Sequence, residues 1–591
     1  MRTAPLTPQA RSAALDALRA STEPGHELDI LVIGGGVTGA GIALDAVSRG
    51  LSTAIVEAQD WASGTSSRST KLAHGGLRYL AMFDFKLVHE ALRERDLLTS
   101  KLAPHLVKPT AFLYPLQHHV YERAYVGAGI ALYDAMASVT GGKRRAVPFH
   151  RHVSHTRMQQ MFPDFRPDVA VGAIQYWDTM LDDARLVETL VRTAVSYGAH
   201  AASRTQLVGL TKSDGGVING AVLVDQETGE RFEARAKHTI NATGVWTEQT
   251  EHLSGSPGGL KVLASKGIHI IVPRSRIRGD VGLILQTEKS VLFFIPWPRY
   301  WVIGTTDTPW NQELRHPVAN RADIDYVIEH ANTVLSEPLT RGDIIGTYAG
   351  LRPLLQPEVK EGTSSTKVSR EHTVASPAPG FTVIAGGKLT TYRVMAEDAV
   401  DFALGARSSS LPSPTRDLPL AGAEGLAVVE NQSKGWAETY GWDEHRRQHL
   451  MGRYGSLLAE LVELVEERPD LAQPLAKAPA YLRAEALYAA THEGALHLDD
   501  VLMHRTRLNY EQADKGVGAL EEIADLVGPV LGWDDATRAR EIQAYVERVQ
   551  AEEAAALESD DASAEEVRLK AADLSPMVDV GERAGNGGSG S

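Results

Sequence analysis

The clearest chemical signal in the sequence is a run of glycines between two short apolar segments. Gly34, Gly36 and Gly39 have the spacing G-x-G-x-x-G, and Glu57 follows them. In this pattern the first glycine permits a tight turn, the second lets the backbone approach a pyrophosphate, and the third allows a helix to pack closely on a sheet. The helix N-terminus then binds the pyrophosphate, and an acidic residue about 20 positions later accepts hydrogen bonds from ribose hydroxyls. The spacing therefore predicts a dinucleotide site.

The segments around these glycines have the patterning of a β-α-β unit. Residues 29–33 form an apolar run, residues 40–48 have helical spacing, and residues 52–57 form a second apolar run. Because strand, helix and terminal acid are all in place, a dinucleotide site is favoured over a structural turn. The glycines alone do not distinguish NAD from FAD.

Composition excludes several kinds of chemistry. The chain has 591 residues, a net charge of −15 and no cysteine. Its length predicts two or three domains, and its negative charge argues against nucleic-acid binding, since nucleic-acid-binding domains are usually basic. The lack of cysteine excludes disulfides, iron–sulfur clusters and a cysteinyl flavin bond. No metal site is expected, because the histidines that invite one lack acidic partners at suitable spacing: His118, His119, His150, His152 and His155.

The segment at residues 61–80 indicates which dinucleotide binds. It reads W-A-S-G-T-S-S-R-S-T-K-L-A-H-G-G-L-R-Y-L, rich in the small residues that let a backbone lie close to an extended ligand. It resembles the S-S-x-x-S/T-K-L-x-H-G-G-L-R-Y-L stretch of FAD-dependent glycerol-3-phosphate dehydrogenases, a family in the glycine-oxidase and D-amino-acid-oxidase superfamily. Three more strings resemble the same family: N-A-T-G-V-W at 241–246, G-T-T-D at 304–307 and G-G-K-L-T-T-Y-R at 386–393.

This resemblance covers roughly residues 29–399 and extends into residues 484–508. It implies a non-covalently bound FAD. A helix that begins near Gly387 would face the pyrimidine edge of the flavin, where its partial positive charge stabilises the anionic reduced ring. Together with the glycine pattern, the resemblance implies these cofactor-binding residues: Gly34, Gly36, Gly39, Glu57, Ser66, Ser67, Lys71, Leu72, His74, Ala242, Gly244, Gly387, Lys388, Leu389 and Thr390.

The implied substrate is glycerol 3-phosphate, which carries a dianionic phosphate and a secondary alcohol. The resemblance places Arg352, Arg370 and Lys388 at this substrate. An arginine fork binds phosphate oxygens in a bidentate manner that lysine cannot reproduce. Arg78 either assists substrate binding or braces its own loop. The implied product is dihydroxyacetone phosphate.

Oxidation removes the hydroxyl proton and transfers a hydride from the adjacent carbon to FAD. Positive charge near the developing alkoxide, from Arg352 and Lys388, would favour this step. His74 and His269 are the candidate bases, because histidine titrates near neutrality. The sequence does not rank one histidine above the other.

The predicted fold class is α/β: a Rossmann-like FAD-binding domain, an interleaved mixed-sheet substrate domain and an all-α C-terminal domain. Residues 1–27 are expected to form a loosely attached extension. Residues 556–591 are expected to be a disordered acidic tail that ends in a linker, G-N-G-G-S-G-S. The expected ranges are 28–100, 180–265 and 340–407 for the FAD-binding domain, 101–179 and 266–339 for the substrate domain, and 420–555 for the helical domain.

Three other functions share parts of the pattern. A glycerol-3-phosphate oxidase has the same substrate groups but passes electrons to oxygen and releases hydrogen peroxide. The family's oxidases often carry an insertion after G-L-R-P, so the short connection at residues 357–366 favours the dehydrogenase. An amino-acid or amine oxidase would need no cation pair for a phosphate. A redox-silent FAD-binding sensor or scaffold would need no substrate cations at all.

The resemblance implies a quinone as electron acceptor, and quinones lie in lipid, so contact with a membrane surface is expected. No stretch of the sequence is apolar and long enough to span a bilayer, and no secretory signal is recognised. The expected location is the cytoplasm, at the inner face of the cell membrane where quinone is reduced. Residues 457–465 have amphipathic spacing, but such a stripe belongs more often to a core than to a membrane surface. The sequence does not decide whether the protein forms a homodimer.

Overall fold

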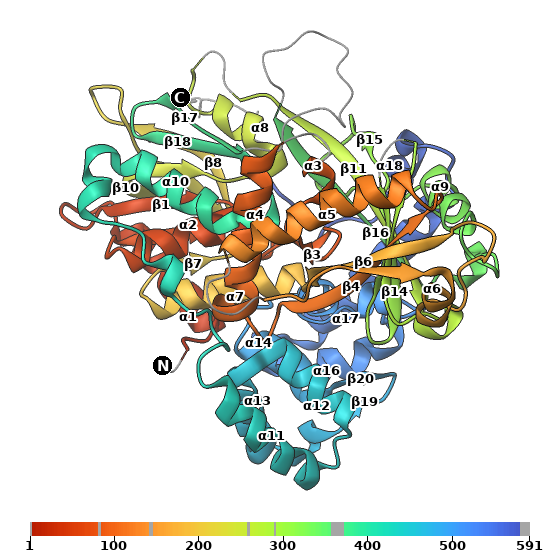
Figure 1. Cartoon of the computed structure of the whole chain (residues 1–591). Helices are drawn as coiled ribbons and strands as arrows, with labels where there is room; N and C mark the ends of the chain where they lie inside the picture. The colour runs from red at the N-terminus through yellow and green to blue at the C-terminus, as the bar shows by residue number, and fades with distance from the viewer. Residues whose placement is uncertain are drawn as a thin grey trace.

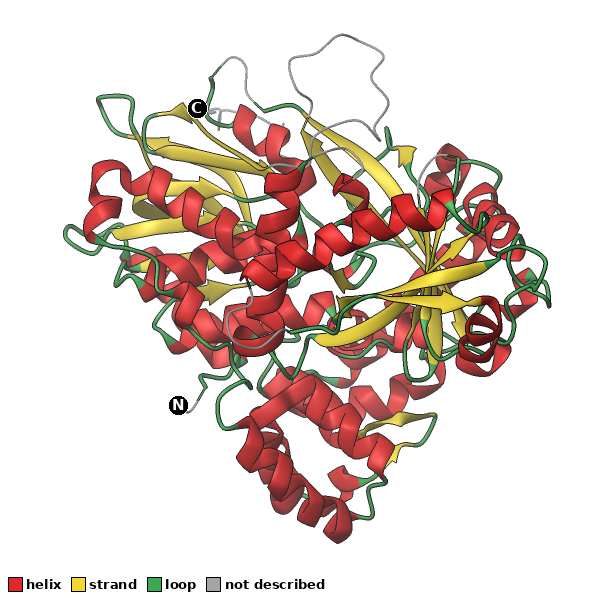
Figure 2. Cartoon of the chain, in the orientation of Figure 1, coloured by secondary structure: helices red, strands yellow, loops and turns green. Residues whose placement is uncertain are grey.

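The computed structural model describes residues 3–80, 84–140, 146–256, 260–288, 291–355 and 372–578 (Figure 1). In this part of the chain, two large β-sheets carry helices on their faces, and a helical region follows them toward the C-terminus (Figure 2). The predicted α/β class with a helical C-terminal domain is confirmed.

The first sheet contains the glycine turn. Its strands are β1 Leu28–Ile33, β2 Thr53–Val56, β7 His200–Ala202, β8 Thr205–Lys212, β9 Ile218–Asp225, β10 Arg231–Asn241, β17 His372–Ala378 and β18 Phe381–Gly386. Strands β7, β2, β1, β10 and β18 lie side by side and parallel, and β17 is antiparallel at the edge. Ile30 and Val32 of β1 lie in one apolar core and Leu31 and Ile33 in another, so both faces are covered. A parallel strand buried on both faces reads as an unbroken apolar run, as residues 29–33 do.

Helices cover this sheet on both sides. Those on the core of Ile30 and Val32 are α2 Val37–Ser48, α7 Asp183–Ser196 and α10 Tyr392–Leu404. On the other side lies α1 Pro8–Ala20, which buries Ala14, Leu15 and Leu18 against the sheet. The expected loose attachment of residues 1–27 is therefore wrong for α1, because its apolar face completes a core.

The second sheet is mostly antiparallel. Its strands are β3 Leu72–Ala73, β4 Lys108–Leu116, β5 Arg151–Ser154, β6 Gly172–Met180, β11 Val262–Pro273, β12 Gly282–Gln286, β13 Val291–Pro296, β14 Tyr300–Gly304, β15 Thr308–Pro309 and β16 Gly346–Leu355. β16 pairs with β11 along its length, with Arg352 opposite Ser265. This pairing corrects the expected domain boundary at residue 340, since β16 belongs to the second sheet rather than to the first.

The helices that accompany the second sheet lie between its strands in the sequence. They are α3 Leu77–Leu80, α4 Phe85–Leu97, α5 Tyr121–Thr140, α6 His155–Met161 and α9 Arg321–Asn332. Helix α8 Thr247–His252 instead packs on β10 and β18 of the first sheet. α5 is a long helix that packs on α4 and crosses the front of the molecule in Figure 1.

The C-terminal region is helical, apart from one short hairpin. Its elements are α11 Leu426–Tyr440, α12 Glu444–Tyr454, α13 Leu458–Glu467, β19 Pro474–Leu475, β20 Ala478–Leu482, α14 Arg483–Thr491, α15 Leu508–Glu511, α16 Leu520–Leu531, α17 Asp535–Ala555 and α18 Asp561–Arg568. The apolar stripe expected at residues 457–465 lies on α13. Its residues Leu458, Leu461, Val462 and Val465 are buried in the core of this region, so the stripe serves packing.

The expected disorder of residues 556–591 is wrong for residues 556–578. Helix α18 packs against α17, and Asp561 and Asp573 pair with Lys266 and His316 of the substrate region. The acidic composition that suggested disorder thus supplies partners for basic residues elsewhere in the fold. Residues 579–591, including G-N-G-G-S-G-S, lie outside the described residues.

Candidate cofactor and substrate site

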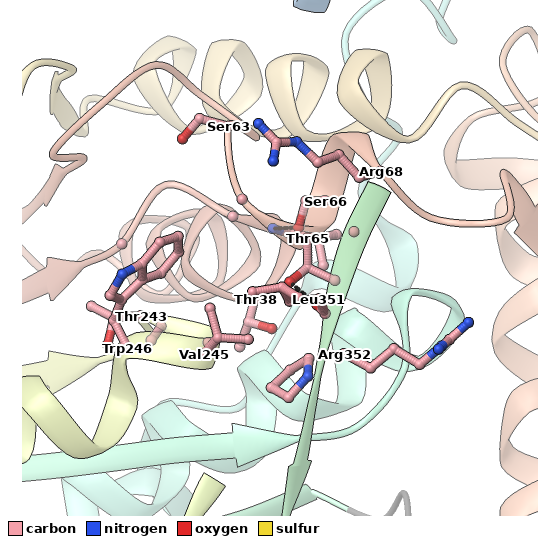
Figure 3. Close-up of a pocket in the computed structure, with 18 of the residues that line it drawn as sticks. Thr38, Ser63, Thr65, Ser66, Arg68, Thr243, Val245, Trp246, Leu351 and Arg352 are labelled. Atoms are coloured by element: carbon pink, nitrogen blue, oxygen red, sulfur yellow. Dashed lines mark hydrogen bonds between the residues drawn. The ribbon is translucent and has the colours of Figure 1, made fainter. Parts of the chain in front are cut away.

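A cavity of about 330 Å³ lies where the two sheets meet (Figure 3). Its walls come from the glycine turn, the segment after β2, the loop after β10, strands β11 and β16, and the start of α10. The structure brings these predicted residues to the cavity: Gly34, Gly36, Glu57, Ser66, Leu72, His74, Ala242, Gly244, His269, Arg352, Gly387, Lys388, Leu389 and Thr390.

Three predicted residues lie away from the cavity, and the side chains of two more are not described. Gly39, Ser67 and Lys71 do not line the cavity. The backbone of Arg78 belongs to α3, but its side chain is not described, and Arg370 lies outside the described residues.

The glycine turn leaves no space for side chains. Gly34 has φ +110°, and a Cβ there would lie 2.6 Å from the carbonyl oxygen of Ala242. A Cβ on Gly39 would lie 1.8 Å from the carbonyl oxygen of Gly34, which is the close helix packing that the pattern predicts. Gly36 is the N-cap of α2 and offers no capping side chain. The turn therefore has the shape required for a pyrophosphate at the N-terminus of α2.

Glu57 is fixed beside this turn by main-chain donors. The N–H groups of Gly35 and Gln59 donate to its two carboxylate oxygens, at 2.6 and 2.8 Å. Burial raises the pKa of Glu57, and these two hydrogen bonds oppose that effect. The carboxylate thus lies at the end of β2 as an oriented acceptor for ribose hydroxyls.

Residues 66–74, here called the cofactor loop, connect the two sheets. Ser66 Oγ accepts a hydrogen bond of 3.0 Å from the N–H of Val37 in the first turn of α2. Lys71 has φ +57°, and its ammonium lies 2.5 Å from Asp183 and donates to the carbonyl of Ser67 at 2.9 Å. Lys71 and Ser67 therefore hold the loop in place rather than face the cavity.

The start of α10 forms the adjoining wall. The Thr390 hydroxyl accepts from the N–H of His74 at 3.1 Å and lies 3.2 Å from the His74 carbonyl. The Lys388 ammonium lies over the ring of Tyr79, 3.7 Å from its centroid. A Cβ on Gly387, where φ is +81°, would lie 2.4 Å from the sulfur of Met395. Glycine is therefore required at position 387. The same wall places the Lys388 ammonium beside the cofactor loop.

Arg352 is held in position by the loop after β14. Its Nη2 donates to the Thr305 hydroxyl at 2.9 Å and to the Thr306 carbonyl at 3.1 Å, and its Nη1 lies 3.5 Å from Asp307. The guanidinium passes over Gly267, where a Cβ would lie 2.3 Å from Nη2. The glycine before His269 in K-G-I-H is thus required by the arginine on the neighbouring strand.

His269 is a buried histidine on the same wall. Its ring stacks on Tyr348, with centroids 4.8 Å apart, and its Nε2 lies 3.2 Å from the Thr70 hydroxyl. Burial, followed by the charges of Arg352 and Lys71, holds the pKa of His269 well below its usual range. The imidazole is therefore neutral at physiological pH and can accept a proton.

Some lining residues were not predicted from the sequence. The Thr65 hydroxyl donates to the carbonyl of Leu351 at 2.6 Å, which joins the residue before the cofactor loop to β16 (Figure 3). Thr70 and Tyr79 also line the cavity, and their place in the family-like string at residues 61–80 is the signal that could have identified them. Tyr348 does not line the cavity but stacks on His269, because β11 pairs with β16, and this pairing is not apparent from the sequence.

Two family models match the chain. The model of FAD dependent oxidoreductases matches residues 29–393, and the model of the C-terminal domain of alpha-glycerophosphate oxidase matches residues 413–538. Fold, cavity and family model together define an oxidoreductase with FAD as cofactor.

Similar proteins narrow this class. The glycerol-3-phosphate dehydrogenase of Mycobacterium leprae is 48% identical over 567 residues, which cover 96% of this chain and 94% of the relative. The human mitochondrial glycerol-3-phosphate dehydrogenase is 35% identical, over 91% of this chain and 74% of the relative. The structure of the Bacillus halodurans glycerol-3-phosphate dehydrogenase complexed with FAD has a TM-score of 0.73 at 26% identity, covering 92% of this chain and 97% of that one. The chain belongs to the family of FAD-dependent glycerol-3-phosphate dehydrogenases.

Proposed function

We propose that the protein oxidises glycerol 3-phosphate to dihydroxyacetone phosphate in this cavity. When bound, FAD supplies the hydride acceptor. The observation that carries the proposal is the position of Arg352, His269 and Lys388 on one cavity whose other walls contain the glycine turn and Glu57. Cations for a phosphate, a proton acceptor and a glycine turn for a dinucleotide thus line the same cavity.

Arg352 is the proposed phosphate ligand. The loop after β14 fixes its guanidinium through the Thr305 hydroxyl and the Thr306 carbonyl and pairs it with Asp307 at 3.5 Å. A dianionic phosphate at this position gains charge-assisted hydrogen bonds. We assign Lys388 to the same substrate and keep Arg78 and Arg370 as further proposed contacts.

His269 is the proposed base. The low pKa of its imidazole leaves the ring neutral and ready to accept the hydroxyl proton at Nε2, which lies beside Thr70. A substrate phosphate on Arg352 offsets the nearby positive charge, which raises the pKa of His269 and lets it keep the proton. His74, whose backbone is bound to Thr390, is the second candidate.

The proposed electron acceptor is a quinone, and the proposed site of membrane contact is α5. Tyr121, Tyr125, Ala128 and Leu132 lie on one exposed face of this helix, with 69%, 71% and 43% exposure for the two tyrosines and the leucine. Exposed aromatic and aliphatic side chains on one helix face suit the interface of a bilayer. Another face of α5 contacts Gly75, the residue that follows the cofactor loop, because the N–H of Gly75 donates to Tyr133 Oη at 2.8 Å.

No helix in the described part of the chain is long and apolar enough to cross a membrane. We propose that the protein attaches peripherally, through α5, at the cytoplasmic face of the membrane. A steady-state assay tests the acceptor: dihydroxyacetone phosphate should form with a quinone analogue in the absence of oxygen. Formation that requires oxygen and yields equimolar hydrogen peroxide would instead identify an oxidase.

A further inference from the structure

The chain segment at residues 575–578 reaches the cofactor cavity from the far C-terminal end of the described sequence. Met577 lines the cavity together with Gln59, which follows β2, and Gln206 of β8. Gln59 contacts Glu57, the acceptor for ribose hydroxyls, through its main-chain N–H. Both glutamines belong to the first sheet or follow one of its strands, whereas Arg352 belongs to β16 of the second sheet. The segment therefore lies at the end of the cavity that suits the adenosine half of a dinucleotide.

Specific hydrogen bonds hold this segment in place. The N–H of Val578 donates to Gln206 Oε1 at 2.8 Å, and Gln206 Nε2 donates back to the carbonyl of Val578 at 2.8 Å. Gln59 Nε2 lies 3.4 Å from the sulfur of Met577. One glutamine side chain thus binds both main-chain groups of Val578, and a second contacts the neighbouring thioether, so Met577 is oriented from two sides.

The residues before Met577 are anchored as well. The buried hydroxyl of Ser575 donates to Glu227 Oε1 at 2.9 Å and lies 3.2 Å from His497 Nε2. Burial alone would lower the pKa of His497, but its hydrogen bonds to Glu227 and Glu541 raise that pKa to about 10. His497 is therefore charged at neutral pH and joins the first sheet, the helical region and the segment at Ser575.

We infer that Met577 forms one wall of the adenosine subsite, and that residues 575–578 are a strap that retains FAD. A thioether is soft and polarisable, and it makes favourable contacts with aromatic rings such as a purine. The strap acts on the cofactor alone, so the inference rests on the assignment of FAD and not on the proposed substrate.

Two pairs of variants test the strap. Deletion of residues 575–591 removes it, and deletion of residues 579–591 is the matched control that keeps it. Met577→Ala removes the thioether, and Val578→Ala is its control, because the Val578 side chain is 47% exposed and its hydrogen bonds are made by the main chain. The measurement is the rate at which flavin fluorescence appears when purified holoenzyme is diluted.

Met577→Ala should release FAD about 2- to 10-fold faster than the wild type. Deletion of 575–591 should release it faster still, whereas both controls should match the wild type. ADP should also compete less well for the apoprotein of Met577→Ala, since ADP carries the adenosine half, while riboflavin affinity stays constant. The proposal is overturned if Met577→Ala releases FAD at the wild-type rate, or if Val578→Ala changes the release rate as much as Met577→Ala does. Glycerol 3-phosphate plays no part in this test, so its outcome is independent of the substrate.

Discussion

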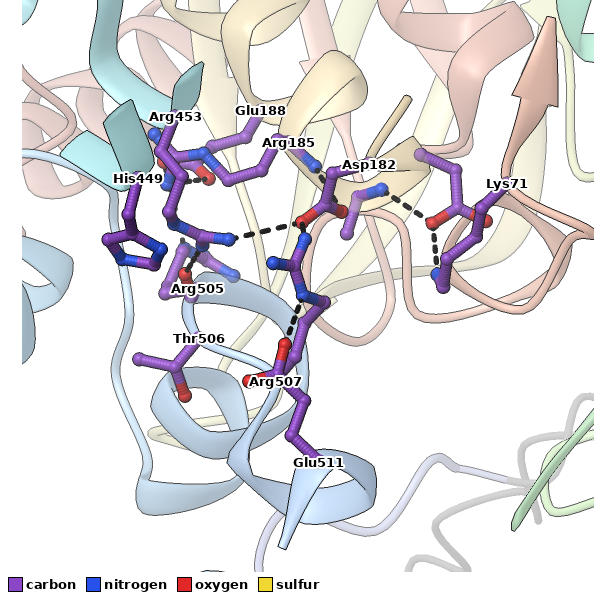
Figure 4. A network of polar contacts seen from close by, with 12 residues as sticks. Lys71, Asp182, Arg185, Glu188, His449, Arg453, Arg505, Thr506, Arg507 and Glu511 are labelled. Atoms are coloured by element: carbon purple, nitrogen blue, oxygen red, sulfur yellow. Dashed lines mark hydrogen bonds and ion pairs between the residues drawn. The ribbon is translucent and has the colours of Figure 1, made fainter. Parts of the chain in front are cut away.

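Lys71 and Asp183 form a buried ion pair, with 2.5 Å between Nζ and Oδ1, that ties the cofactor loop to the first turn of α7. The preceding residue, Asp182, is the N-cap of α7 and is held by Arg507 and Arg453 of the helical region, at 2.5 and 3.2 Å (Figure 4). Although burial alone would raise it, these arginines hold the pKa of Asp182 at about 2. The C-terminal region thus braces the cofactor loop through two adjacent aspartates.

Replacement of Asp183 tests this bracing. Asp183→Asn leaves the Lys71 ammonium buried without its carboxylate, so the free energy of unfolding should fall by about 3–5 kcal/mol. Denaturant unfolding followed by fluorescence measures the change. The control is Asp325→Asn, which breaks the exposed pair with Arg341 and should cost less than about 1 kcal/mol. Equal losses in the two variants would show that the buried pair has no special role.

The phosphate site is tested by Arg352→Lys. Lysine keeps the charge but loses the fork, so binding of glycerol 3-phosphate should weaken by about 1.5–3 kcal/mol, seen as a lower kcat/KM with normal FAD content. Arg166→Lys, at an exposed arginine, is the control and should leave both quantities unchanged. Loss of FAD from Arg352→Lys would mean that this arginine serves the cofactor.

The base is tested by His269→Asn beside His74→Asn. Removal of a general base typically slows the chemical step by about 10²- to 10⁴-fold, and we expect this loss in kcat for His269→Asn. Because the pKa of His269 lies well below its usual range, kcat/KM of the wild type should stay flat on the acid side until the pH falls well below 6.5. A larger loss in His74→Asn than in His269→Asn would transfer the role to His74.

Membrane contact through α5 is tested with lipid vesicles. The double variant Tyr121→Ser/Tyr125→Ser removes the two most exposed aromatic rings of the helix, so co-sedimentation with phospholipid vesicles should fall several-fold. Tyr197→Ser is the control, since Tyr197 is 42% exposed at the end of α7. If the control loses as much binding, or if the wild type does not bind vesicles, α5 is not the contact.

The features predicted best from the sequence are those set by local geometry. The glycines at 34, 36 and 39 have a fixed spacing, and Gly39 is required by the carbonyl of Gly34 in the same turn. Glu57 directly follows the adjacent strand, so a short string carries the information.

Features that depend on distant partners were not predicted. Lys71 turns away from the cavity because its backbone is left-handed and its partner Asp183 lies 112 residues away. The acidic tail is ordered because Asp561 meets Lys266 across 295 residues. Composition cannot reveal such pairings. The strap at residues 575–578 was not predicted for the same reason, because its partners Gln59 and Gln206 are far from it in the sequence.

An anaerobic titration of the holoenzyme with glycerol 3-phosphate tests the central claim most directly. The account predicts that the flavin absorbance bleaches in proportion to the substrate added, and that equimolar dihydroxyacetone phosphate appears. Glycerol, which has the alcohol but lacks the phosphate, should bleach the flavin far less at the same concentration. Flavin that stays oxidised at saturating glycerol 3-phosphate, while dithionite reduces it, would contradict the account.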